Sequence, residues 1–260
     1  MRRVLFIGNS HLAALKNGLA ELSPNLNYEP VFFGLHGDLM RQVGIRGSCL
    51  VPLSAKALRT SRAIWGVEAV DCSEYDVICL VGMGSNIRTL HPLVSEFQTT
   101  DGPASGDRHV ISTETYRSAV VGLFGQSLAG FTARNVQKAT QKPLFLVPQP
   151  APDHKAISEE ATEGARPGRN KKVRWLRQLA YSEESAALSK LIPEALLEAT
   201  GASGYVPQPQ ETLETPFTTK SEFMSGSKRL MNSRAHEKSD NIHANALYGQ
   251  LVLESVNGLN

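Results

Sequence analysis

The sequence has few cysteines, no long apolar run and almost no net charge. Its three cysteines, in 260 residues, are an odd number, and no two have C-x-x-C spacing. Neither a disulfide framework nor a cysteine-ligated zinc site is therefore indicated. No stretch approaches the ~18 apolar residues of a membrane span. The net charge of +2 gives no reason to expect binding to nucleic acid or to an anionic membrane.

Sequence signatures of several other classes are also missing. There is no G-x-G-x-x-G and no Walker lysine for a nucleotide phosphate, and no H-x-x-x-H or H-E-x-x-H spacing for zinc. The four apolar residues after Arg3 are fewer than the ~7–15 of a signal peptide. We expect a soluble cytoplasmic protein with no cofactor and no catalytic metal.

Short apolar runs alternate with helical patterns along the chain. The runs expected to form strands are 3–8, 28–34, 76–82, 143–150 and 204–207. Helices are expected over 11–22, 113–139, 183–200 and 242–257. Nearly continuous apolar strands separated by helices are typical of a parallel sheet covered on both faces. The sequence therefore predicts a single α/β domain over 1–260, a three-layer α/β/α sandwich with a mostly parallel, about five-stranded sheet.

Two stretches interrupt this alternation and are predicted as long loops, which in compact domains are often functional. Residues 91–112 are rich in Gly, Pro, Thr, Ser and Asp, and residues 151–174 are polar and end in a basic cluster. That cluster is either a solvated surface run or part of a loop that folds over a charged substrate. Its members are Arg166, Arg169, Lys171, Lys172 and Arg174.

Polar residues follow the first strand, at the end of a parallel strand where ligands of open α/β sheets bind. The strand ends in G-N-S-H (8–11), and a helical pattern begins at once. Ser10 could present its hydroxyl and its N–H, together with the first helix amides, to a cleft. Alternatively, Ser10 or Asn9 only caps the helix.

The second and third strands also end in small or polar residues. Gly34 and Gly37 follow the second strand, either as turn residues or where the backbone approaches a ligand. Asn86 follows the third strand and could donate an amide hydrogen into the cleft or form an Asx turn.

Asp240 and His243 lie three residues apart, where the last helix is expected to begin. On a helical turn this spacing lets a carboxylate reach an imidazole on the same side. Alternatively, Asp240 or Ser239 is the N-cap and His243 is an ordinary residue of the first turn.

The order of these motifs resembles the SGNH (GDSL-type) hydrolase family. Gly-x-Ser ends the first strand, a glycine follows the second, Gly-x-Asn follows the third, and D-N-I-H-A-N-A-L-Y-G (240–249) is similar to the family's last block. The resemblance implies a flavodoxin-like sandwich and a serine esterase. It assigns Ser10 as nucleophile, His243 as general base and Asp240 as the residue that orients the base.

The resemblance also implies an oxyanion hole formed by the Ser10 N–H, the Gly37 N–H and the Asn86 side-chain amide, with Gly34 as the alternative glycine. One residue departs from the family pattern, because the first block is commonly Gly-Asp-Ser and Asn9 stands in place of the aspartate. The change removes a negative charge beside the serine but no proton carrier of the mechanism.

Further residues are expected around the substrate. Asn9, His36 and Gly84 are predicted to line the site, and His11 to have a structural or rim role. The expected reaction is hydrolysis of a carboxylic ester, with an O-acetyl or other short acyl group on a carbohydrate or small metabolite, through an acyl-enzyme. The alternatives are an acyltransferase with the same triad and a non-catalytic binding protein of the same fold. We expect no nucleic acid or membrane partner.

Overall fold

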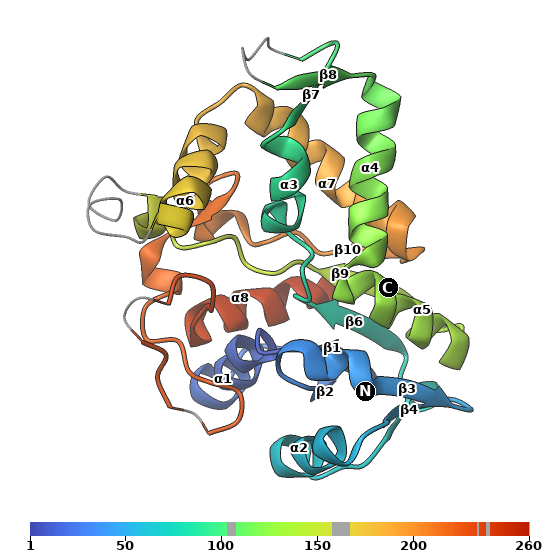
Figure 1. Cartoon of the computed structure of the whole chain (residues 1–260). Coiled ribbons are helices and arrows are strands. Elements are labelled where there is room, and N and C mark those ends of the chain that lie inside the picture. Colours follow the sequence, from blue (N-terminus) through green and yellow to red (C-terminus); the bar gives the residue numbers. More distant parts are fainter. Residues whose placement is uncertain (103–107, 158–166, 233, 238–239, 260) are drawn as a thin grey trace.

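The central element is a five-stranded parallel sheet with the order β10-β9-β6-β1-β2 (Figure 1). Its strands are β1 (Arg2–Gly8), β2 (Tyr28–Gly34), β6 (Val77–Val81), β9 (Leu144–Val147) and β10 (Gly204–Tyr205). All five lie within the apolar runs predicted as strands, except that β1 begins one residue earlier. Strand β2, which contains Pro30, lies at an edge, where a residue without an N–H is tolerated. The computed structural model describes residues 1–102, 108–157, 167–232, 234–237 and 240–259, with only the backbone of 167–173.

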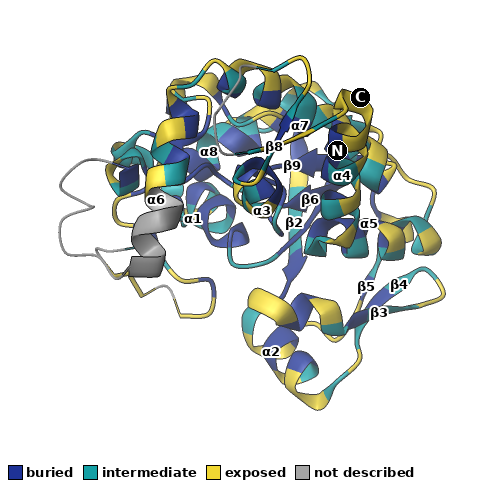
Figure 2. Cartoon of the chain, turned by 45° about the horizontal axis from the view of Figure 1, so that its top comes forward, coloured by how far each residue is buried: buried dark blue, intermediate teal, exposed yellow. Residues whose placement is uncertain are grey.

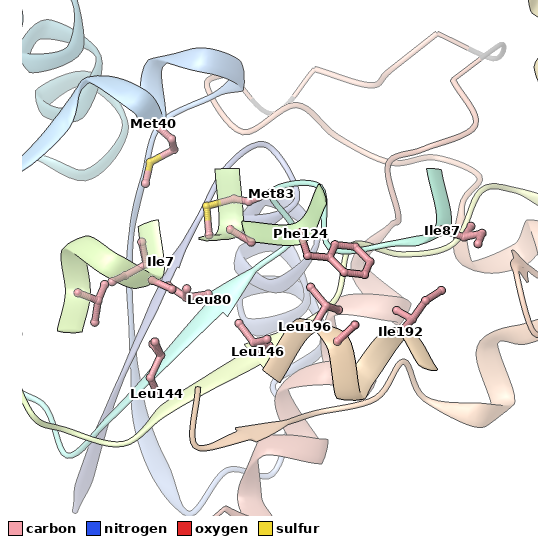
Figure 3. Packing of buried hydrophobic residues seen from close by; sticks show 14 of the residues in the cluster. Ile7, Met40, Leu80, Met83, Ile87, Phe124, Leu144, Leu146, Ile192 and Leu196 are labelled. Carbon is pink, nitrogen blue, oxygen red and sulfur yellow. The ribbon is translucent and has the colours of Figure 1, made fainter. Parts of the chain in front are cut away.

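Helices cover both faces of the sheet, so the fold is the predicted three-layer α/β/α sandwich. Leu5 and Ile7 of β1 belong to one hydrophobic cluster, and Val4 and Phe6 to another, because successive side chains of a strand point to opposite faces. The first face carries α4 (Thr113–Gln126), α5 (Leu128–Ala139) and α7 (Glu184–Thr200), and the second carries α1 (Leu12–Leu22) and α8 (Ala246–Ser255). Figure 3 shows side chains of the first cluster between the sheet and its helices.

Helices α1 and α8 pack closely against each other. A Cβ on Gly249 would fall on the carbonyl group of Ala14, and one on Gly18 would lie 2.5 Å from the backbone nitrogen of Gln250. Glycine at these two positions therefore allows the backbones to approach. The contact fixes α8, and the turn that precedes it, against the start of α1.

Two predicted helices have different limits. The expected helix over 113–139 is interrupted at Ser127, whose Oγ accepts the N–H of Gly130 and donates to the carbonyl of Phe124, so a new helix begins there. The last helix begins at Ala246 rather than at 242, because the Asn245 side chain caps it.

The two predicted loops contain regular structure. Residues 91–112 include α3 (His91–Val94) and the parallel pair β7 (Phe97–Thr99) and β8 (His109–Ile111), and α3 is held by the buried Leu93 and Val94. The 151–174 prediction is wrong from residue 167 on, since α6 (Pro167–Ala180) begins there and buries Leu176 and Leu179.

Several short elements were not predicted. An antiparallel sheet is formed by β3 (Val43–Arg46), β4 (Cys49–Pro52) and β5 (Val70–Asp71), and a hairpin by β11 (Leu213–Thr215) and β12 (Thr218–Thr219). The first sheet and α2 (Ala55–Trp65) lie at one end of the molecule, where α2 has a largely exposed outer face (Figure 2). No helix in the described part of the chain is long and apolar enough to span a bilayer.

Candidate active site

Ser10 lies in the turn between β1 and α1, at the C-terminal end of the parallel sheet. No side chain caps α1, and the Oγ of Ser10 lies 2.9 Å from Nε2 of His243. Its backbone N–H has no acceptor among the described residues. The hydroxyl is therefore bound to an imidazole rather than used as a helix cap, and the amide remains free to bind a ligand.

His243 and Asp240 meet in a tight turn that precedes α8. Oδ1 of Asp240 accepts the N–H groups of Ile242 and His243 at 3.0 Å, and Oδ2 lies 2.8 Å from Nδ1 of His243. An ionised carboxylate only accepts hydrogen bonds, so Nδ1 carries the proton and Nε2 is left to accept from the Ser10 hydroxyl. The two residues meet through an Asx-type turn and not on a first helical turn, and Ser239 is outside the described residues.

The surroundings of Asp240 favour its charged form. Burial alone would raise the pKa of the carboxyl, but the hydrogen bonds from Ile242 and His243, with the charge of His243, outweigh burial and hold the pKa below its ordinary value. The carboxylate is therefore ionised at neutral pH and can orient the imidazole.

Two further imidazole rings, those of His236 and His11, stack on His243. Neither residue was predicted from the sequence to lie beside it. The ring centroid of His236 lies 4.1 Å from that of His243 with an interplanar angle of 9°, and the centroid of His11 lies 5.1 Å away at 26°. Nδ1 of His236 is 3.1 Å from Oδ2 of Asp240, so the carboxylate oxygen that binds His243 also lies close to the His236 ring. The H-x-x-x-D-x-x-H spacing of 236, 240 and 243 is the signal that could have identified His236.

This cluster also has the residue types of a metal site. The donor atoms of His236, Asp240 and His243 lie within 4.8 Å of one another. However, an ion bound to an imidazole lies in the plane of the ring, where the nitrogen lone pair points. Two nearly parallel stacked rings have no common position in both planes, so an ion could bind both only after a ring turned. The geometry favours a hydrogen-bonded cluster over a metal centre.

His11 is buried, with only 6% of its surface exposed, and Nδ1 has no hydrogen-bond partner among the described residues. It therefore lies inside the site and not at the rim, so of the two expected roles the structural one remains. Burial, followed by the nearby His243, lowers the pKa of His11 from 6.5 to about 3.

We predict that this buried neutral histidine makes stability depend on pH. The unfolded chain binds a proton at His11 below about pH 6.5, whereas the folded chain does so only near pH 3. The unfolded state therefore holds more protons in this window. As the pH is lowered through it, the free energy of unfolding should decrease by up to ~1.4 kcal/mol per pH unit. Urea titrations at pH 7, 6, 5 and 4 measure this slope. His11→Phe should reduce it, and equal slopes in both proteins would contradict the prediction.

A cavity of about 540 Å³ opens beside these groups. Ser10 and His243 line it together with Asn9, Gly84 and Asn86. The structure thus brings five of the predicted site residues to one cavity, with Asp240 hydrogen-bonded to His243 behind its surface.

Asn86 forms the turn considered for it in the sequence, and its donation into the cleft stays a prediction. Its Oδ1 accepts the N–H of Arg88 at 3.1 Å, which is the cap, and its Nδ2 donates to the carbonyl of Pro150 at 3.3 Å. An amide nitrogen carries two hydrogens. The second one makes no hydrogen bond to a described residue, and Asn86 lines the cavity.

The residues predicted from the end of β2 do not line this cavity. Gly37 is exposed at the start of a 3-10 turn, with φ +54°, and His36 precedes it. Gly34, the alternative oxyanion residue, is buried against its register partner Gly8. The described lining comes instead from segments that follow β1, β6 and β9, from α6 and from the 240–243 turn, so neither glycine joins Ser10 there.

Other lining residues were not identified from the sequence. Arg88, Gln149 and Trp175 border the cavity, but none belongs to a motif with a chemical signature of its own. A second cavity of about 400 Å³ adjoins the first and shares Asn86 and Gln149 with it. Together the two cavities give room for a ligand larger than either one holds.

The fold and the site define a three-layer α/β/α protein with a hydrogen-bonded Ser–His–Asp chain at the carboxyl end of its sheet. The chain matches no family model and no curated protein. Among solved structures it is similar to a candidate platelet activating factor from Streptococcus pneumonia, with 14% identity, a TM-score of 0.38 and coverage of 98% of this chain and 82% of that chain. It is also similar to a candidate GDSL-like lipase from Parabacteroides merdae, with 15% identity, a TM-score of 0.33 and coverage of 100% and 96%. Likeness this distant carries no argument about activity.

Proposed function

We propose that this protein is a serine hydrolase of the SGNH type that cleaves a carboxylic ester. One observation carries the proposal: Ser10 Oγ, His243 and Asp240 form a continuous hydrogen-bonded chain with steps of 2.9 and 2.8 Å. A serine hydroxyl is a weak nucleophile without a base in reach, and the base needs a third group to fix its tautomer. A protein that only bound ligands would have no use for this order of contacts.

In the proposed reaction, Ser10 Oγ attacks the ester carbonyl and its proton passes to Nε2 of His243. The negative charge that develops on the carbonyl oxygen is stabilised by the Ser10 N–H and the Asn86 amide. Collapse of the intermediate breaks the C–O bond, and His243 returns the proton to the leaving alcohol. Water then repeats the sequence on the acyl-enzyme and releases the acid. Asp240 stabilises the imidazolium in both halves.

The substrate is an ester with an O-acetyl or other short acyl group on a carbohydrate or small metabolite, acted on in the cytoplasm. Acyl transfer remains a second candidate, because the adjoining 400 Å³ cavity could hold an acceptor alcohol next to the acyl-enzyme. 4-Nitrophenyl esters of increasing acyl length test the main proposal through release of nitrophenolate. Turnover should be highest at the shortest acyl groups, and a steady rise toward long chains would contradict the proposed substrate class.

We predict that removing the Asn86 donor slows the reaction without stopping it. Loss of one oxyanion donor typically lowers kcat by ~10²–10³. Asn86→Asp is the informative variant, because its carboxylate can still accept the Arg88 N–H that caps the turn but no longer donates. Asn135→Ala, which removes a side-chain hydrogen bond to Val43 elsewhere, is the control. Equal kcat in Asn86→Asp and wild type would rule out the oxyanion assignment.

A further inference from the structure

The cavity beside Ser10 has an unbalanced set of charges. Among the described residues that line it, none is aspartate or glutamate, and Arg88 is the one with a permanent charge. Asp240, a carboxylate of the site, is already hydrogen-bonded to the His243 imidazole and to two backbone N–H groups, and His236 lies 3.1 Å from it. A ligand in the cavity therefore meets a cation and no competing anion on the wall.

Arg88 has no counter-ion of its own in the described chain. No described carboxylate lies within ion-pair distance of its guanidinium, whereas Arg62, Arg108 and Arg117 are each paired with a glutamate. Arg88 is exposed over part of its surface, but partial burial of the guanidinium lowers its pKa, and the charge of Asp240 opposes that shift. Because a guanidinium stays protonated in proteins, the unpaired charge remains and favours an anion that enters the cavity.

The sequence that leads to another wall of the cavity is also rich in positive charge. Trp175 and Leu176 of α6 line the cavity, and four of the six residues before Trp175 are basic. Positive charge on the wall of a cavity raises the local concentration of anionic ligands.

We propose that the ester's alcohol part carries an anionic group, a carboxylate, phosphate or sulfate, and that Arg88 binds it. The inference rests on the proposed esterase activity, and it narrows the substrate class. A guanidinium presents a planar pair of N–H donors that matches the two oxygens of such a group. Neutral carbohydrate esters would lack this contact.

The first test compares two acetyl esters that differ in charge and little in shape, 4-acetoxybenzoate and the neutral 4-acetoxybenzamide. Wild type should prefer the anionic ester by ~10–100-fold in kcat/KM, the range of a charge-assisted hydrogen bond. Arg88→Gln should bring the ratio close to one. Arg59→Gln, which removes an exposed guanidinium from α2, should keep the wild-type ratio. A ratio near one in wild type, or a preference that survives Arg88→Gln, would overturn the proposal.

The second test separates this inference from the esterase proposal by measuring binding without turnover. Saturation-transfer NMR on Ser10→Ala reports weak binding of benzoate and benzamide. Benzoate should bind more strongly than benzamide, and the difference should vanish in Ser10→Ala/Arg88→Gln. That result supports the anion site even if wild type hydrolyses no ester. Equal signals from both ligands in Ser10→Ala would overturn it even if wild type proved to be an esterase. Circular dichroism confirms that each variant is folded.

Discussion

Ser10→Ala and His243→Ala are each expected to lower kcat for ester hydrolysis by up to ~10⁶, the loss seen when a triad loses its nucleophile or its base. The reason is the 2.9 Å contact between Ser10 Oγ and His243 Nε2. Without the hydroxyl no acyl-enzyme forms, and without the imidazole nothing takes the proton of the hydroxyl. Nitrophenolate release from 4-nitrophenyl acetate measures both variants.

Two matched controls make this result specific. Ser255→Ala removes an exposed serine of α8 whose hydroxyl binds only the carbonyl of Leu251, and His109→Ala removes an exposed histidine of β8. Both should keep wild-type turnover. If Ser10→Ala, correctly folded, retained more than a small fraction of the wild-type rate, another residue would be the nucleophile and the proposed function would fail.

Asp240→Asn is expected to have the second-largest effect, a loss of ~10⁴ in kcat, as in other triads whose orienting acid becomes an amide. Its Oδ1 can still accept the N–H groups of Ile242 and His243, so the turn should form. Its Nδ2, however, would face the Nδ1–H of His243, which in wild type donates to the carboxylate. His243 then has to place its proton on Nε2, where it can no longer accept the proton of Ser10.

The control for this variant is Asp71→Asn, because Asp71 also closes a short turn by accepting a backbone N–H, from Ser73, but lies away from the cavity. It should leave kcat unchanged. A loss below tenfold in Asp240→Asn would show that the carboxylate is not needed to orient the base. The urea midpoint of Asp240→Asn should stay near that of wild type. A clearly lower midpoint would show that the loss of kcat comes from unfolding.

Much of the fold follows from local patterns. Strand β6 is continuously apolar because both of its faces are buried, and β1 has the same character up to Gly8, so the sheet and its two layers of helices can be predicted. The short strands β3, β4 and β5 have half-exposed residues and no clear alternation, and α6 begins within a basic polar stretch. Those elements depend on tertiary contacts that the sequence pattern does not show.

The candidate site, like the fold, could be predicted from the sequence only in part. Ser10, Asn86 and His243 each stand where an element of the α/β fold begins or ends, so their positions could be predicted, and the structure brings them to one cavity. Gly37 could not be placed in the same way, because the direction of the chain after β2 depends on a 3-10 turn. The stacking of His11 on His243 joins parts of the chain more than 200 residues apart and has no local signal, whereas His236 lies close to His243 in the sequence.

Reaction with a fluorophosphonate tests the central claim most directly, because only an activated serine reacts quickly and the result does not depend on the natural substrate. Wild type should gain one adduct by intact-protein mass spectrometry, and peptide mapping should place it on Ser10. Ser10→Ala should gain none, and His243→Ala should react far more slowly. A folded wild-type protein that is not labelled, or is labelled at another residue, would contradict the assignment of Ser10, His243 and Asp240 as a catalytic triad.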